Sequence, residues 1–286
     1  MLIRERILLQ LLRAAGRAVS RVELVKWAFL LRQDRAGVIG DSFYEFFPHR
    51  RGPYSFVLRR EMDRLVADGI VSTEGETWEW IRSESASGLP AEDARSVASV
   101  CHRYREMAEG ELLSDVYQRF PDFTMCSDTR PLAGRATGTI QVHTCGYEGV
   151  SIDGFLRLLI CSGLRRLVDV RRNPVARRYG FHKSTLAHLC GEVGIEYQHL
   201  PELGIASEHR SGDSAFASRG DLLAWYEREH LPTVPGAVRE VADSVAHRPT
   251  AVMCREANPC ECHRSRLAQR VADLTGLPVA HLRPSS

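Results

Sequence analysis

The C-terminal half of the chain, residues 139–286, predicts an α/β fold built on a mostly parallel sheet with helices on both faces. Short apolar strand patterns alternate there with amphipathic helix patterns, an order typical of three-layer domains with parallel strands. The expected strands cover residues 139–144, 167–170, 195–199, 250–253 and 279–282. The first 82 residues show another order, three helix patterns and then a hairpin. The sequence therefore predicts two domains of different fold.

The helices expected in the α/β domain fill the intervals between these strands. The first helix is capped by Ser151, and the second covers residues 184–193. The third interval holds two helix patterns, at residues 219–230 and 235–247. The last helix begins at Cys262. This alternation predicts a Rossmann-like arrangement. In such sheets the ligand site gathers beyond the carboxyl ends of the strands.

The N-terminal helices are bounded by clear end signals. Apolar residues recur at helical spacing from Leu2 to Leu12, and Ser20 with Glu23 forms a capping box for a second helix. A third amphipathic helix is expected over residues 54–68, and residues 70–81 alternate like a hairpin. Three helices followed by a hairpin resemble a winged helix-turn-helix domain, which we expect at residues 1–82.

A winged helix that binds DNA places its third helix in the major groove. The candidate DNA-binding residues are Arg50, Arg51, Arg59, Arg60 and Arg64. Residues 1–82 hold 14 basic and 11 acidic residues, a net charge of only +3, and the hairpin carries Glu74, Glu76 and Glu79. A winged helix that binds another protein through a solvated charged face is therefore the alternative.

Residues 83–138 predict a helical connector and linker. Residues 83–90 form a polar break, one or two helices follow over residues 91–117 with a join near Gly110, and residues 128–138 are rich in Pro, Gly and Arg.

Composition limits the cellular setting. The 286 residues carry a net charge of +2, so any basic surface for nucleic acid must be local. The eight cysteines are scattered, which favours free thiols in a reducing compartment over a disulfide framework. No signal peptide and no apolar run long enough for a membrane span is recognisable. We expect a cytoplasmic protein without a membrane partner, with a homodimer as one candidate assembly.

Residues 250–264 concentrate the groups most capable of chemistry. An apolar strand leads into Cys254 and Glu256, and a helix begins at Cys262, His263 and Arg264. A helix N-terminus attracts anions and lowers the pKa of a thiol. Buried packing of the cysteines is one alternative. A zinc site with Cys260 as a further ligand is another, but the spacing lacks the usual pair of knuckles, so we expect neither a metal nor a cofactor.

The ends of the other strands carry further candidates. Tyr147 follows the first strand, and Asp169 ends the second, where it either acts as a general base or orients Arg171. The candidate phosphate-binding residues are Tyr147, Arg171, Arg172, Asn173, His199 and Arg264. Residues 165–183 hold seven basic residues and one acid, and Tyr179 and Phe181 could stack on a base together with Tyr147. A solvated charged surface is the alternative for the basic run.

Several motifs occur in order across residues 139–286 and resemble the family of domain of unknown function 488. They are Gly146-Tyr147-Glu148-Gly149, Asp169-Val-Arg171-Arg-Asn-Pro174, Phe181, Gly194-Ile-Glu-Tyr197-Gln-His199-Leu-Pro-Glu-Leu-Gly204, Met253-Cys254-Arg-Glu256 and Cys262-His263-Arg264. Ile205 stands where the pattern has a second glycine, and Cys260 is extra to it. The resemblance implies the α/β fold and names no reaction.

These observations predict a nucleic-acid-associated enzyme that acts on a nucleobase, nucleotide or phosphate in the C-terminal pocket while the winged helix docks on DNA. Cys254 or Cys262 would be the nucleophile, and His263, Glu256 or Asp169 would move protons. The alternatives are a ligand-sensing transcriptional or defence-system regulator without turnover, and an interaction module with a vestigial pocket.

Overall fold

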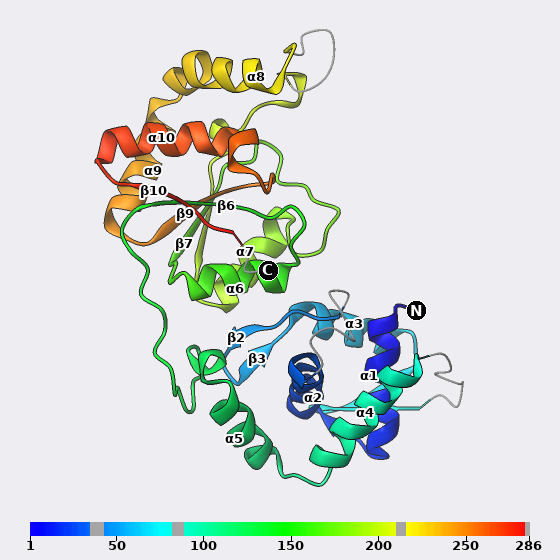
Figure 1. Cartoon of the computed structure of the whole chain (residues 1–286). Helices are drawn as coiled ribbons and strands as arrows, with labels where there is room; N and C mark the ends of the chain where they lie inside the picture. The colour runs from blue at the N-terminus through cyan, green and yellow to red at the C-terminus, as the bar shows by residue number, and fades with distance from the viewer. Residues whose placement is uncertain (35–42, 82–88, 210–215, 284–286) are drawn as a thin grey trace. The chain divides into compact units, whose positions relative to one another are not determined.

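The computed structural model describes residues 1–34, 43–81, 89–209 and 216–283. The chain divides into two compact units, Met1–Gly134 and Arg135–Ser286 (Figure 1). Among the described residues, no helix combines the length and the apolar character needed to cross a membrane. The predicted linker start at residues 83–88 lies outside the described residues.

The first unit contains the three predicted helices and the predicted hairpin. The helices are α1 (Ile3–Ala15), α2 (Arg21–Asp34) and α3 (Phe56–Ala67), and the strands are β1 (Val19–Ser20), β2 (Phe47–His49), β3 (Gly52–Tyr54), β4 (Val71–Glu74) and β5 (Thr77–Trp80). The antiparallel hairpin β4–β5 is extended by β1, which pairs with β5, and β2 pairs with β3. The capping box of α2 is confirmed: the Ser20 hydroxyl accepts from the Glu23 amide at 3.1 Å, and the Ser20 amide donates to the Glu23 carboxylate at 2.8 Å.

Helices α4 (Ala91–Tyr104) and α5 (Glu109–Arg119) complete the core of the first unit. We expected them to connect two domains, but in the structure they pack against α1 and α2. Their apolar side chains, including Val97, Val100 and Val116, are buried in the same core as those of the first three helices. Gly110 lies inside α5, and the join between the helices is at residues 105–108.

Lys26 is a buried lysine inside the first unit. Its side chain is 2% exposed, and its Nζ donates to the Pro53 carbonyl at 2.9 Å. Burial lowers the pKa of Lys26 to about 7; the negative charge of Glu109 opposes this shift, and the positive charge of Arg51 adds to it. Folding therefore favours the neutral amine.

The depressed pKa predicts a pH dependence of stability. Between about pH 7 and the ordinary Lys value of 10.5, the unfolded chain binds the proton that the folded chain has lost. The free energy of unfolding should therefore rise with pH in this window, by up to roughly 1.4 kcal/mol per pH unit from this group. Lys26→Met should remove that rise, whereas Lys183→Met, at an exposed lysine of the second unit, should keep it. Urea unfolding at pH 7.5 and pH 9.5, followed by tryptophan fluorescence, measures the difference; equal slopes in both variants would contradict the prediction.

The second unit is an α/β domain on a five-stranded sheet in which all paired strands are parallel. The strands are β6 (Val142–Gly146), β7 (Arg166–Asp169), β8 (Glu196–His199), β9 (Thr250–Cys254) and β10 (Val279–His281), in the spatial order β10-β6-β9-β7-β8. The helices are α6 (Ile152–Cys161), α7 (Lys183–Glu192), α8 (Arg219–Trp225), α9 (Pro235–His247) and α10 (His263–Thr275). The predicted α/β class and the parallel sheet are confirmed.

The two faces of this sheet are covered by different helices. Figure 1 shows α6 and α7 on one face and α9 and α10 on the other. The chain leaves β6 toward α6 and leaves the neighbouring strand β9 toward α10, so the connections diverge to opposite faces beside β9. Such a point of divergence opens a crevice at the carboxyl edge of a parallel sheet. Strand β6 begins later than we expected, and Cys145 and Gly146 lie inside it rather than after it.

Candidate functional site

The loop after β9 is held against β6 by a close backbone approach. A Cβ on Gly146 would lie 1.9 Å from the Glu256 carbonyl oxygen, so only glycine fits at this position. The Arg255 carbonyl accepts hydrogen bonds from the amides of Tyr147 and Glu148. A 3₁₀ turn, Pro259–Glu261, then leads to Cys262, the N-cap residue of α10. These contacts fix the loop that carries Glu256.

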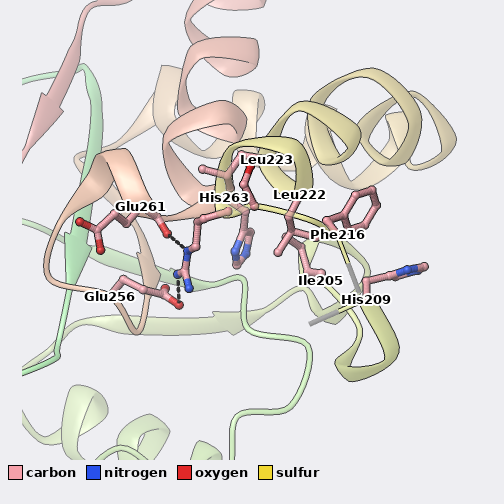
Figure 2. Close-up of a pocket in the computed structure, with 10 residues that line it drawn as sticks. Ile205, His209, Phe216, Leu222, Leu223, Glu256, Glu261 and His263 are labelled. Carbon is pink, nitrogen blue, oxygen red and sulfur yellow. Dashed lines mark hydrogen bonds and ion pairs between the residues drawn. The ribbon is translucent and has the colours of Figure 1, made fainter. Parts of the chain in front are cut away.

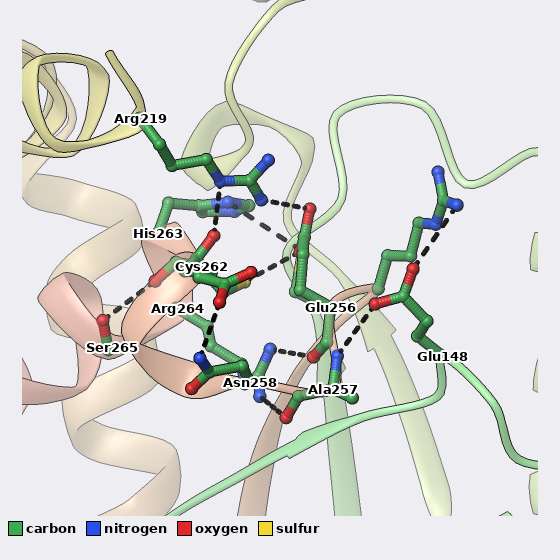
Figure 3. A network of polar contacts seen from close by, with 12 residues as sticks. Glu148, Arg219, Glu256, Ala257, Asn258, Cys262, His263, Arg264 and Ser265 are labelled. Carbon is green, nitrogen blue, oxygen red and sulfur yellow. Dashed lines mark hydrogen bonds and ion pairs between the residues drawn. The ribbon is translucent and has the colours of Figure 1, made fainter.

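Cys254, Glu256, Cys262 and His263 meet at this edge, and we refer to them as the Cys–Glu–His cluster. Both thiols donate to the same carboxylate oxygen, Glu256 Oε2, at 3.2 Å from Cys254 Sγ and 3.0 Å from Cys262 Sγ. His263 Nδ1 lies 3.9 Å from Cys254 Sγ. Both cysteines and His263 are at most 2% exposed, and Figure 3 shows Glu256, Cys262 and His263 within a network of polar contacts. The sequence-predicted candidates Cys254, Glu256, Cys262 and His263 are thus brought together.

The resting cluster favours a charged Glu256 carboxylate and a protonated Cys262 thiol. Burial alone would raise the pKa of Glu256, but the hydrogen bonds from Cys262, from the Glu256 backbone amide and from Cys254, in decreasing order of effect, lower it to about 2. Burial and the neighbouring Cys254 raise the pKa of Cys262 above its ordinary value. The expected lowering of a thiol pKa at the helix N-terminus is therefore wrong for Cys262, because removal from water and the neighbouring Cys254 raise that pKa instead.

Arg264 is buried and binds the backbone of the loop that follows β9. Its side chain is 1% exposed, and its guanidinium donates to the carbonyls of Glu256 and Ala257, the latter at 3.1 Å. Arg219, from the start of α8, donates to Glu256 Oε1 at 3.0 Å and to the Glu261 carbonyl at 2.7 Å. Arg264 therefore holds the loop backbone, and Arg219 holds Glu256 Oε1, the carboxylate oxygen that the thiols do not contact.

Asp169 and Arg171 form a buried ion pair at the end of β7. The Arg171 guanidinium donates through Nε to Asp169 Oδ1 at 2.9 Å and through Nη2 to Asp169 Oδ2 at 2.6 Å. The Tyr197 hydroxyl adds a bond to Asp169 Oδ2 at 2.7 Å. Although burial opposes it, the bonds and charge of Asp169 raise the pKa of Arg171. This arrangement favours the orienting role of Asp169 over that of a base.

Arg171 also organises the aromatic residues beside the site. Its Nη1 donates to the Tyr147 hydroxyl at 3.1 Å and to the Phe181 carbonyl at 2.9 Å. The rings of Tyr147 and Phe181 stack on each other with centroids 4.2 Å apart. His199 bonds through Nε2 to the Arg171 carbonyl at 2.9 Å. Most donors of Arg171 are thus engaged within the protein.

Two cavities open beside the Cys–Glu–His cluster. One of about 190 Å³ is lined by Tyr147, Arg171, Arg172, Asn173, Val175, Ile205, Ser207, Cys254 and Arg255. The other, of about 170 Å³, includes His209, Phe216, Arg219, Glu256 and His263 (Figure 2). The predicted Tyr147, Arg171, Arg172 and Asn173 therefore share a cavity with Cys254, whereas His199 and Arg264 line neither.

The residues of the predicted basic run lie in several places, with Arg171 and Arg172 at the cavity beside Cys254. Arg177 and Arg178 line a cavity of about 490 Å³ together with Tyr147, Glu148 and Arg255, which lies outside the run. Arg166 instead donates to the Ser244 hydroxyl and pairs with Glu196. Arg177 and Arg178 could therefore reach a ligand in that cavity, whereas Arg166 stabilises the fold.

The candidate DNA-binding arginines of the first unit also divide. Arg50, Arg51 and Arg59 line a cavity of about 240 Å³ together with Arg21 and Lys26, which we call the basic pocket. Arg64 instead pairs with the buried Glu5. Arg60 is exposed on α3 and does not line the pocket.

Sequence reasoning missed Arg219, Ile205, His209, Phe216 and Arg255. Arg219 follows the N-cap Ser218, which was a readable helix signal, but only the fold brings α8 to Glu256. Sequence spacing also argued against a metal. The structure nevertheless brings Cys254 Sγ, Cys262 Sγ and a ring nitrogen of His263 within 4.8 Å of one another.

These features define the second unit as a parallel α/β domain with a thiol, carboxylate and imidazole site at the edge of its sheet. Residues 151–271 match the family described as domain of unknown function DUF488. The match spans Asp169, Arg171, Cys254, Glu256 and the Cys262-His263-Arg264 motif, so the resemblance inferred for the C-terminal domain is supported there. No curated protein and no solved structure matches the chain.

Proposed function

We propose that the chain is a nucleic-acid-associated enzyme. Its first unit would dock on DNA, and its second unit would act on a nucleobase, nucleotide or phosphate at the Cys–Glu–His cluster. The observation that carries the proposal is the meeting of two thiols, a carboxylate and an imidazole at a sheet edge that opens into cavities lined by arginines.

The order of elements in the first unit supports a winged-helix reading. Three helices and the hairpin β4–β5, with β1 added to its edge, follow the arrangement of winged helix-turn-helix domains. The basic pocket gathers Arg21, Arg50, Arg51 and Arg59, and such a cluster attracts the phosphates of a nucleic acid. Arg59 also pairs with Asp63, and Arg21 pairs with Glu76 of the hairpin. Arg50 and Arg51, exposed at the β2–β3 turn, are the strongest candidates for phosphate contacts.

Fluorescence anisotropy of the full chain on labelled duplex and single-stranded DNA tests the docking step. The double variant Arg50→Ala/Arg51→Ala should weaken binding to all sequences and reduce the slope of log affinity against log salt by about 2, because two phosphate contacts are lost. The double variant Arg95→Ala/Arg103→Ala on α4 removes the same charge from exposed positions outside the basic pocket and should keep the slope. Absence of binding by the wild-type chain at low salt would remove nucleic acid from the proposal.

The catalytic step needs a separate readout. Nucleotides and oligonucleotides with modified bases are incubated with the full chain, and products are sought by mass spectrometry. Glu256→Gln should abolish turnover and keep the DNA affinity, since Glu256 belongs to the cluster and not to the basic pocket. A product that forms equally with the variant would show that the cluster is not the reactive site.

One observation favours a ligand-sensing regulator as the second candidate. The raised pKa of Cys262 keeps that thiol protonated near neutral pH, so it is a weak nucleophile there. A regulator should change its DNA affinity when a phosphate-bearing ligand is added and should form no product. That result would replace the enzyme proposal.

A further inference from the structure

The geometry points to a zinc site formed by Cys254, Cys262 and His263, with Glu256 as the fourth ligand. The donor atoms would be the two Sγ atoms, His263 Nδ1 and Glu256 Oε2. Two sulfurs, one imidazole nitrogen and one carboxylate oxygen make a donor set that suits a tetrahedral zinc ion.

The distances among three of the donor atoms fit one ion, because Cys254 Sγ, Cys262 Sγ and a ring nitrogen of His263 lie within 4.8 Å of one another. With zinc–sulfur bonds of about 2.3 Å and zinc–oxygen or zinc–nitrogen bonds of about 2.1 Å, donor atoms on a tetrahedron lie about 3.6 Å apart. Glu256 Oε2 is 3.2 Å from Cys254 Sγ and 3.0 Å from Cys262 Sγ. His263 Nδ1 is 3.9 Å from Cys254 Sγ. Small shifts of these three side chains would therefore suffice to bind the ion, whereas the Glu256 carboxylate, which lies beside both sulfurs but outside that group of three, would have to move toward His263.

The imidazole of His263 is held in the form that a metal needs. Its Nε2 lies 3.3 Å from the Val170 carbonyl, which can only accept a hydrogen bond. The proton of the neutral ring therefore belongs on Nε2, and the lone pair of Nδ1 faces Cys254. Hydrogen bonding of the second ring nitrogen to a carbonyl is the usual support of a metal-binding histidine. The Tyr226 ring, 5.1 Å away between centroids, packs against the imidazole and limits its rotation.

The surroundings also support the carboxylate ligand. Arg219 Nη2 binds Glu256 Oε1 at 3.0 Å and leaves Oε2 for the two sulfurs. Two thiolates and a carboxylate exceed the charge of one zinc ion by one, and the buried Arg264 together with the N-terminus of α10 offsets this excess. The pairing of adjacent Cys262 and His263, which the spacing argument disfavoured, is feasible because Cys262 is an extended N-cap residue and His263 is the first residue of the helix.

Glu256 is the ligand most suited to exchange. Its side chain is 15% exposed and lines the same cavity as His263 (Figure 2). Both cysteines, in contrast, are buried. A ligand entering this cavity could therefore take the fourth position. Under this inference the thiols are ligands and not nucleophiles, which deepens the proposed function. The existence of the metal site does not rest on that function.

The metal content of the purified full chain tests the site. Plasma mass spectrometry should find roughly one zinc ion per chain. Cys254→Ser, Cys262→Ser and His263→Ala should each lose it. Cys260→Ser changes the exposed cysteine two residues before Cys262 and should retain the full amount. Zinc that disappears equally from the Cys260 variant, or a wild-type chain that takes up no zinc when it is supplied, would overturn the inference.

A second measurement guards against variants that fail to fold. Co²⁺ added to the metal-free wild-type chain should give the intense visible bands of a tetrahedral site and a near-ultraviolet band from thiolate ligands. Weak bands of octahedral cobalt would overturn the site, as would a Cys254–Cys262 disulfide in the chain purified under reducing conditions. Neither measurement uses nucleic acid. A failed DNA experiment with bound zinc would therefore reject the docking proposal alone, and a metal-free chain that still binds DNA would reject the zinc site alone.

Discussion

Replacing Asp169 by Asn is expected to lower the free energy of unfolding of the second unit by about 3–5 kcal/mol, the usual effect of removing one partner from a buried ion pair. Asp169 is fully buried, and Arg171 is 5% exposed. The amide nitrogen of Asn would face the donors of Arg171 and Tyr197, which now bind the carboxylate. Arg171 would keep its charge without a counterion, because a guanidinium stays protonated in proteins.

Hydrogen exchange of the β7 amides in a urea series reports on this unit alone. The matched control is Glu196→Gln, which also changes a carboxylate paired with arginines, Arg166 and Arg248, but at a side chain that is 49% exposed. Solvent screens that pair, so the control should lose less than about 1 kcal/mol. If both variants lose the same amount, the buried pair is not a major source of stability.

The sequence predicted the layout of the α/β domain because its signals are local. Ser151 caps α6 through a bond from the Gly154 amide, and each strand pattern lies on a strand of the sheet. The outcome for α4 and α5 differed, because helical periodicity shows that a face is apolar and does not show which partner covers it. Val100 and Val116 carry the same pattern whether they form a connector or, as observed, the core of the first unit.

The location of the site could be predicted from the sequence, but the protonation states of its groups could not. The rule for strand ends brought Asp169, Arg171 and Cys254 to one edge, and the fold agrees. The state of each group depends on burial, which a sequence does not display. The helix N-terminus predicted an acidic thiol at Cys262, but burial and Cys254 raise its pKa. Spacing rules likewise argued against a metal because they describe pairs of ligands close in sequence, and they do not foresee that the fold brings Cys254, at the end of a strand, to Cys262 and His263, at the start of a helix.

Replacing Gly146 by Ala is expected to disrupt the Cys–Glu–His cluster and to lower the free energy of unfolding by about 1–3 kcal/mol or more. The added Cβ would stand 1.9 Å from the Glu256 carbonyl oxygen and 2.7 Å from its carbonyl carbon. Both are backbone atoms, so the loop itself must move. Since the same carbonyl accepts from Arg264, the shift would also break the contact that ties α10 to the loop.

Thiol labelling mapped by mass spectrometry detects this disruption directly. In the wild-type chain the exposed Cys161 and Cys260 should react quickly with a maleimide, while Cys254 and Cys262, each 1% exposed, react slowly. In the Gly146→Ala variant the two buried thiols should react several times faster.

Gly191→Ala is the matched control, because its Cβ meets nothing within 4 Å and Gly191 lies in α7. Alanine there should stabilise the helix by about 0.5–1 kcal/mol and leave the labelling unchanged. Unchanged labelling in the Gly146 variant as well would mean that the loop yields without moving Glu256. The close approach of β6 to the loop would then not be what holds the carboxylate between the two sulfurs.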